Sequence, residues 1–351
     1  MKLKFIYAVR GYAILVVIIL HSLGSLLDNK GFLGLLVNKG KFGVQFFFIA
    51  SAFTLFLSYN NRALKEHKVN KNFFIRRFFR IAPLYYIGII FFYFFNGLSP
   101  VIPYCNYTQI SLISILSNIF FFHGFSPYWI NSLVPGGWSI AIEMMFYFTL
   151  PFLYQKIKSL NSAIFLTIIS LFLSFFLKVL LLKLHIISCE KMLLDYFYLY
   201  LPNQFPIFCL GIIAYFIIIK RDYIVHNNNI FFALVLVFIF LIWKLILTQE
   251  FIFSLGLLFF FYYLSISESS ILINPLIVFL GKISYSAYLT HFIFYYLIKE
   301  YVDITLFQPV LRYFISFFIV FIPTLIISSL TYYFIEIPFQ KIGKKIINYK
   351  S

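Results

Sequence analysis

The chain has 351 residues, of which 62% are hydrophobic and only 11% are charged, and its mean hydropathy is +0.95. A soluble domain has roughly 45–50% apolar and 25% charged residues, so this composition predicts a membrane protein. A net charge of +17 would suggest nucleic acid as the partner of a soluble protein. Here the basic residues fall between apolar runs, where topology explains them, so we expect no nucleic acid.

Ten segments are apolar over the roughly 17–25 residues that a membrane-spanning helix needs. They are 5–27, 42–60, 81–97, 138–155, 162–182, 203–219, 230–248, 250–266, 282–299 and 310–336. The first is expected to be an uncleaved span rather than a signal peptide, because Arg10 interrupts its apolar run. The pattern predicts an all-α, multi-pass transmembrane bundle with a single domain over residues 1–351.

The distribution of basic residues predicts the orientation of this bundle. With the N-terminus inside, 18 of the 28 Lys and Arg residues fall in inner loops and flanks, and 9 fall in outer ones. Positive charge is retained on the cytoplasmic side, so both termini are expected there. The apolar stretch 111–122 is too short to cross, and we expect it to be re-entrant or interfacial.

The three cysteines indicate neither a redox motif nor a metal site. They form no CxxC pair and no His–Cys ligand spacing, and the histidines lie on separate spans. Cys105 and Cys189 both fall in predicted outer loops, where a disulfide between them is an open alternative.

Arg10 and His21 are polar residues inside the first apolar segment. Eleven residues make roughly three helical turns, so both side chains are expected on one face, about 16 Å apart along the axis. An ionisable residue within a membrane is costly, which favours a functional role for this pair.

Glu143 lies in the fourth predicted span, at about the same depth below the outer surface as His21. The two could meet, and a carboxylate that orients a histidine ring is a plausible general-base unit. The alternative is a protonated Glu143 that satisfies a contact between helices.

Two further groups have helical spacing. Ser284, Tyr288 and His291 fall on one face and are expected to line an interior, although a histidine there is often a packing element. Arg77 and Arg80 precede the third predicted span, where planar guanidinium groups suit phosphate oxygens. Glu336 could pair with these arginines or be a plain charge at a helix end.

Five motifs in order resemble the integral-membrane acyltransferase family 3. They are Arg10-x10-His21, Arg77-Phe-Phe-Arg80, Trp138-Ser-Ile-Ala-Ile-Glu143, Ser284-Tyr-Ser-Ala-Tyr-Leu-Thr-His291 and Glu336-Ile-Pro338. The resemblance implies transfer of an acyl group, usually acetyl, from cytoplasmic acyl-CoA to a hydroxyl of an envelope glycan, such as a polysaccharide or lipopolysaccharide. It implies a bacterial inner-membrane location and no permanently bound cofactor. Many relatives carry a C-terminal extracytoplasmic hydrolase-like domain, and we expect this chain to act without one.

The resemblance also implies roles for individual residues. His21 would be the catalytic histidine, supported by Arg10, and Arg77 and Arg80 would hold the phosphates of the coenzyme. The remaining positions, expected to line the donor and transfer path, are Trp138, Ser139, Glu143, Tyr288 and His291. His21 is expected to act as a general base, and a covalent acyl-histidine relay stays open.

Other functions and partners also stay open. A multi-pass transporter of an anionic or acylated substrate would carry buried Arg, Glu and His too, but the charges cluster in the first half without an echo in the second. A non-catalytic membrane protein would not need polar groups along one face of its first span. Besides membrane lipid, acyl-CoA and a glycan or lipid-linked acceptor, a partner protein or a homo-oligomer is compatible with the sequence.

Overall fold

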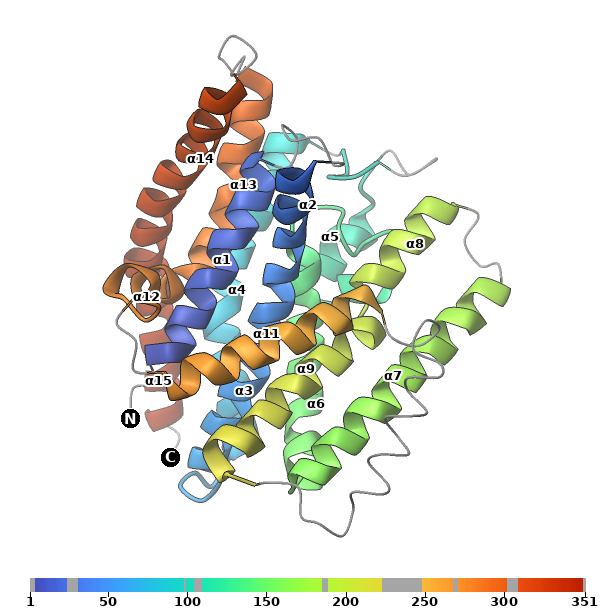
Figure 1. Ribbon diagram of the computed structural model, residues 1–351, viewed down its shortest axis with the longest axis vertical. Coiled ribbons are helices and arrows are strands. Elements are labelled where there is room, and N and C mark those ends of the chain that lie inside the picture. Colours follow the sequence, from blue (N-terminus) through green and yellow to red (C-terminus); the bar gives the residue numbers. More distant parts are fainter. Residues whose placement is uncertain are drawn as a thin grey trace. The chain divides into compact units, whose positions relative to one another are not determined.

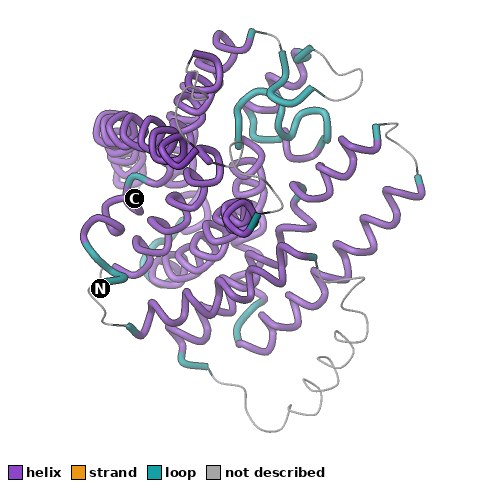
Figure 2. The backbone as a smooth tube through the Cα atoms, turned by 45° about the horizontal axis from the view of Figure 1, so that its top comes forward, coloured by secondary structure: helices purple, strands orange, loops and turns teal. Residues whose placement is uncertain are grey.

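The computed structural model describes residues 4–23, 31–97, 99–103, 109–184, 189–222, 248–267, 271–301 and 309–349. Within these ranges the regular structure is helical and no strand is present (Figure 2), which confirms the predicted all-α class. The first helices are α1 Lys4–Leu23, α2 Phe32–Asn38, η1 Lys39–Phe42, α3 Gly43–Ala63, α4 Val69–Asn96, α5 Leu112–Ile119, η2 His123–Phe125 and α6 Gly137–Lys156. Those that follow are α7 Leu160–Lys183, α8 Glu190–Leu199, α9 Leu201–Tyr215, η3 Phe216–Lys220, α11 Gln249–Ile266, α12 Pro275–Lys282, α13 Ser284–Tyr301, α14 Pro309–Thr331, η6 Tyr332–Glu336 and α15 Ile337–Tyr349.

Seven of the described helical segments are long and apolar enough to cross a membrane, or eight if the bent pair α12 and α13 counts as one span. This confirms the multi-pass class, because only structures that bond their own backbone groups can cross lipid. The helix α6 coincides with a predicted span but is not among the seven. Residues 230–247 of another predicted span lie outside the described residues. The total of ten spans and the orientation stay predictions.

The helix α4 differs from its predicted boundaries. The third span was expected to begin at residue 81 after a basic loop, whereas α4 begins at Val69 and carries Arg77 and Arg80 within one continuous helix. Arginine and lysine are good helix formers whose long side chains reach back toward water, so the basic segment extends the helix. Pro83 lies inside α4 and does not end it.

The chain packs into two compact units. Unit 1 comprises residues 1–47, 70–90 and 266–351, and unit 2 comprises residues 48–69 and 91–265. The expectation of a single domain over residues 1–351 stays a prediction.

In unit 1 the beginning and the end of the chain are packed together. The helix α1 lies against α12, α13 and α14, and α13 lies against α14 (Figure 1). Glycines allow the closest approach: a Cβ at Gly11 would overlap the carbonyl of Ile277, and one at Gly281 would overlap the carbonyl of Tyr7. Small residues that bring backbones together are typical of helix packing in membranes.

A sharp bend separates α12 from α13. The two axes meet at 80°, and the break falls at residue 283, at the beginning of the span that the sequence predicted over 282–299. The side chain of Asn274 caps the start of α12 by accepting from the N–H of Ile277. The start of α13 is held to α4, because the Tyr285 hydroxyl donates to the carbonyl of Ile81 at 2.6 Å.

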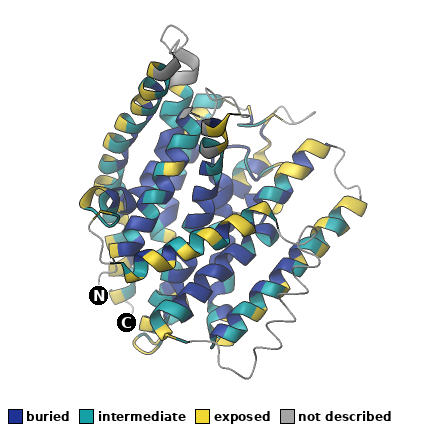
Figure 3. Ribbon diagram, in the orientation of Figure 1, coloured by how far each residue is buried: buried dark blue, intermediate teal, exposed yellow. Residues whose placement is uncertain are grey.

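In unit 2 the helix α9 packs against α6, α7 and α8. Nearly all of its residues are buried, whereas α7 and α11 carry exposed apolar side chains along their length (Figure 3). A face of exposed apolar residues suits contact with lipid. The helix α5 spans only eight residues, in agreement with the expectation that this stretch is too short to cross.

Two of the three cysteines lie in unit 2 of the described structure. Cys209 is free and buried in α9, and Cys189 is disulfide-bonded. Cys105, its predicted partner, lies outside the described residues.

Candidate functional site

Two histidines meet in unit 1. The ring of His21, near the end of α1, lies 5.2 Å from the ring of His291 on α13, between centroids. Phe292 and Tyr295 complete the described ring contacts of His21, at 4.6 and 5.9 Å. We call these four residues and Tyr288, whose ring lies 5.8 Å from that of His291, the histidine cluster.

The two histidines differ in burial and in bonding. His21 is partly exposed, whereas His291 is fully buried. The Nδ1–H of His291 donates to the carbonyl of Ala287 at 3.1 Å, one turn earlier in α13. This bond fixes the tautomer, so that Nε2 carries a lone pair and no proton. The expectation that Ser284, Tyr288 and His291 line an interior is confirmed, since all three are buried.

Glu336 is the second polar centre of unit 1. It lies in the π-helical turn η6, is buried, and accepts hydrogen bonds from both the backbone N–H and the hydroxyl of Ser286. Ser286 belongs to the first turn of α13, where N–H groups lack partners within the helix. The carboxylate therefore caps α13 directly after the bend.

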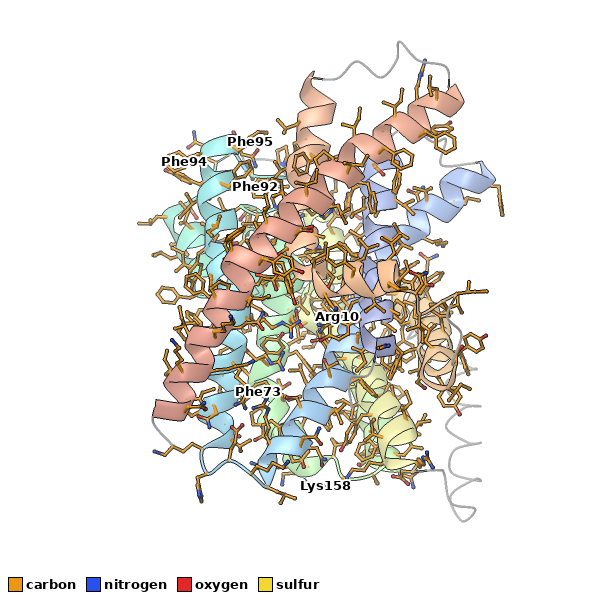
Figure 4. The ribbon with its side chains drawn as sticks, turned by 90° about the vertical axis from the view of Figure 1, so that its left-hand side faces the viewer. Arg10, Phe73, Phe92, Phe94, Phe95 and Lys158 are labelled. Carbon is orange, nitrogen blue, oxygen red and sulfur yellow. The ribbon has the colours of Figure 1, made fainter. Side chains whose placement is uncertain are left out.

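Two arginines act on this carboxylate. The positive charges of Arg80 on α4 and Arg10 on α1 both lie close enough to Glu336 to stabilise its negative charge. Figure 4 labels Arg10. The pairing of Glu336 with Arg77 and Arg80, which the sequence left open beside a plain charge at a helix end, stays a prediction.

Arg77, one turn before Arg80, packs against an aromatic ring. Its guanidinium carbon lies 5.7 Å from the centroid of Phe73. Figure 4 shows Phe73 near the beginning of α4 and Phe92, Phe94 and Phe95 near its other end. A cation over an aromatic face is held in orientation by the ring quadrupole, which limits where the guanidinium can point.

Glu143 is the polar centre of unit 2. One of its carboxyl oxygens, Oε1, accepts from the hydroxyl of Ser51 on α3 and from that of Tyr147 at 2.7 Å. Ser51 and Tyr147 are buried, whereas Glu143 is partly exposed. Two donors on a single oxygen fix the orientation of the carboxyl group and leave its other oxygen directed elsewhere.

The start of α6 is held by buried polar groups. Gly136 precedes the helix with a positive φ of 71°, and its carbonyl accepts from the Ser139 hydroxyl at 3.0 Å. The Nε2–H of His123 donates to the carbonyl of Gly137 at 3.0 Å. Trp138 packs edge-on against Phe48, with 6.0 Å between ring centroids. Ser139 and Trp138 therefore have structural contacts in addition to the expected role in the transfer path.

A family of known proteins matches this chain. The sequence profile of a family described as an acyltransferase domain matches residues 3–333, which is nearly the whole chain. The chain belongs to this acyltransferase family. The resemblance drawn from the five motifs is thereby confirmed.

Individual relatives match the chain over a shorter region. "Putative O-acetyltransferase SAR0937" of Staphylococcus aureus (strain MRSA252) is 44% identical over 79 residues, which is 22% of this chain and 12% of that protein. "Putative O-acetyltransferase SACOL0978" of S. aureus (strain COL) is 44% identical over 78 residues, with the same shares. The match thus spans about an eighth of the length of these relatives. No solved structure matches the chain.

The structure distributes the expected site residues over both units. Unit 1 holds Arg10, His21, Arg77, Arg80, Tyr288 and His291, and unit 2 holds Trp138, Ser139 and Glu143. His21 and Glu143 each have their own described neighbours within their own unit. Their expected pairing stays a prediction, and so do the catalytic and coenzyme-binding roles.

Sequence reasoning missed several partners of these residues. Tyr147 follows Glu143 by one helical turn, so the i, i+4 spacing could have indicated it. Ser51 is 92 positions from Glu143, and Ser286 is 50 positions from Glu336. No local pattern predicts a contact over such separations.

Proposed function

We propose that this acyltransferase moves an acetyl group from acetyl-CoA on the cytoplasmic side to a hydroxyl of an envelope glycan, within a bacterial inner membrane. Family membership and the names of the relatives support the reaction class. The observation that carries the proposal is the histidine cluster, in which a partly exposed His21 lies beside a buried His291. An imidazole at the border between a buried and an accessible environment suits proton transfer from a hydroxyl.

The reaction balances with His21 as the general base. The acceptor oxygen forms a bond to the carbonyl carbon of the thioester, and the bond between that carbon and sulfur breaks. The proton of the hydroxyl passes to His21 and from there to the thiolate that leaves, so that coenzyme A departs as a thiol. His21 is neutral again at the end of the cycle.

The arginines of α4 support the donor side of the proposal. A coenzyme presents several phosphate groups, and guanidinium groups bind phosphate through paired hydrogen bonds. Arg77 is oriented by the Phe73 ring, and Arg80 and Arg10 both lie close enough to Glu336 to interact with its charge. These arginines would hold the phosphates while the thioester reaches toward His21.

The first experiment expresses the parent chain and a His21→Ala variant in a host that lacks related enzymes. Mass spectrometry of envelope glycans before and after alkali treatment measures ester-linked acyl groups. Because general-base catalysis contributes about 100-fold or more, His21→Ala should lose nearly all of the base-labile mass gain. His67→Ala, which changes an exposed histidine between α3 and α4, is the matched control and should keep it.

Three results would count against parts of the proposal. No gain with the parent chain, at confirmed expression, would contradict acyl transfer to envelope glycans and favour a transporter. An equal gain of base-labile acyl mass with the parent chain and with His21→Ala would support acyl transfer but contradict the role of His21 as the general base. A covalent acyl label on the parent in the absence of acceptor, lost in His21→Ala, would replace direct transfer by an acyl-histidine relay.

A further inference from the structure

The Nε2 atom of His291 is a buried hydrogen-bond acceptor that no described part of the chain satisfies. The side chain is fully buried, its Nδ1–H is used by the carbonyl of Ala287, and Nε2 has no hydrogen-bond partner among the described residues. Buried polar atoms in folded proteins are almost always hydrogen-bonded. An acceptor left in this state indicates a partner that is not part of the described chain.

The surroundings of this atom are those of the proposed reaction centre. The His291 ring lies 4.1 Å from Phe292, 5.2 Å from His21 and 5.8 Å from Tyr288, all between centroids. His21 is partly exposed and its ring lies beside that of His291, so a molecule that presents a hydroxyl to His21 has neighbouring atoms near His291. The missing donor can therefore belong to the molecule whose hydroxyl is deprotonated by His21.

The single proton of the attacking hydroxyl determines what that donor is. The attacking hydroxyl has one proton, and in the proposed reaction it passes to His21. It cannot also be given to His291, which lacks a proton at Nε2 and can only accept. A second donor on the same sugar is the group that can supply the hydrogen bond to His291.

We propose that His291 is a specificity-determining residue that accepts a hydrogen bond from a second donor of the acceptor sugar. This donor is a hydroxyl or an amide N–H on the carbon next to the one that carries the attacking hydroxyl. The inference rests on the proposed function and names the class of acceptor: a glycan residue with two neighbouring donors. A sugar residue whose attacking hydroxyl has no such neighbour leaves Nε2 of His291 unsatisfied and binds less well.

Two variants separate the two nitrogens of His291. In His291→Asn the amide lies near the place of Nδ1, where it can still donate to Ala287, but nothing replaces Nε2. In His291→Gln the longer side chain puts an amide oxygen near the place of Nε2. The assay uses enzyme in lipid nanodiscs, acetyl-CoA, and host envelope glycan stripped of its esters by mild base.

We expect His291→Asn to lower kcat/KM for the glycan by about 10-fold or more, and His291→Gln to recover most of this loss. The KM for acetyl-CoA should stay within about 2-fold of the parent value in both, because the lost bond belongs to the acceptor. Equal losses in the two variants, or a raised KM for acetyl-CoA in place of the glycan effect, would overturn the inference. The second result would assign the donor group to the coenzyme instead.

A measurement on the parent chain needs no folded variant. Two-dimensional NMR of the enzymatically acylated glycan locates the new ester. We expect every acylated carbon to have a neighbour with a hydroxyl or an amide N–H. An ester on a carbon whose neighbours carry neither would overturn the inference even though transfer is established, whereas a parent without any transfer overturns the proposed function as well.

Discussion

Hydroxyl groups donate hydrogen bonds to two carboxyl groups, that of the partly exposed Glu143 and that of the buried Glu336. Glu143 accepts from Ser51 and Tyr147, and Glu336 accepts from the hydroxyl and the backbone N–H of Ser286. A polar group taken out of water is tolerated only when such bonds replace its hydration. At the scale of the residue, specific hydrogen-bond partners therefore stabilise these polar groups. Removal of one partner should lower the free energy of unfolding by a measurable amount.

Tyr147→Phe should destabilise unit 2 by about 1–3 kcal/mol, because the carboxyl oxygen of Glu143 loses one of its two donors. Thermal unfolding of the purified protein in detergent measures this loss. Tyr154→Phe is the control, since it removes a neutral bond from the Tyr154 hydroxyl to Asn60 at 3.0 Å. The control should lose about 0.5–1.5 kcal/mol. An equal or smaller loss in Tyr147→Phe would contradict a special role of the bond to Glu143.

Glu336→Ala should destabilise the protein by about 3 kcal/mol or more. The change leaves the N–H of Ser286 without its acceptor and the charges of Arg80 and Arg10 without their carboxylate. Glu66→Ala is the matched control, since it removes a 2.9 Å ion pair with the 41% exposed Arg62 and should cost less than about 1 kcal/mol. Similar unfolding midpoints for the two variants would show that Glu336 does not stabilise unit 1.

His123 should make the protein sensitive to acid. Burial lowers the pKa of His123 from 6.5 to about 4, so the folded protein keeps this ring neutral where the unfolded chain protonates it. The free energy of unfolding should therefore fall between about pH 6.5 and pH 4, by at most about 1.4 kcal/mol per pH unit, and be unaffected by this residue above pH 7. His123→Gln can still donate to Gly137 and should flatten the pH profile of unfolding. An unchanged profile would contradict this assignment.

At the scale of the element, the distance to the neighbouring helix distinguishes glycines that look alike in the sequence. Gly281 lies where α12 contacts α1, and an added methyl group there would overlap the carbonyl of Tyr7. Gly256 lies in α11, and an added methyl group would meet nothing within 4 Å. Both glycines are helical, so the difference between them is entirely one of tertiary contact.

Gly281→Ala should therefore separate α12 from α1 and destabilise unit 1 by about 1–3 kcal/mol, as overpacking does. Gly256→Ala should be neutral or stabilise by about 0.5–1 kcal/mol, because alanine is the better helix former. Unfolding midpoints of the two variants in one detergent provide the comparison. A neutral Gly281→Ala would show that the two helices can shift apart without loss.

At the scale of the whole molecule, charge is expected to fix the orientation in the membrane. The connection between α3 and α4 and the start of α4 are strongly basic, which predicts a cytoplasmic position. Leu64→Cys, at a 97% exposed position in this region, should react with a membrane-impermeant maleimide only in inside-out vesicles. Phe32→Cys, at a 74% exposed position of α2, should react on intact spheroplasts. Labelling of both from one side would contradict the predicted topology, and the unlabelled parent controls for its own cysteines.

Most of the helices could be predicted because lipid leaves a backbone few choices. Long apolar runs must bond their own N–H and C=O groups, so α1, α3, α7 and α11 follow from composition and length alone. The start of α4 was misjudged because basic residues do not end a helix. The bend before α13 was not predicted because it depends on a contact far along the chain, in which Glu336 satisfies the N–H of Ser286 just after the bend.

The sequence by itself determined the class of this protein, the family to which it belongs, and the polar residues that lie inside its apolar helices. These depend on composition and on spacing along one chain, which any window of residues displays. Only the tertiary structure decided that His21 meets His291, that Ser51 holds Glu143, and that Glu336 caps α13. Those contacts join residues far apart in sequence, and the packing of whole helices brings them together.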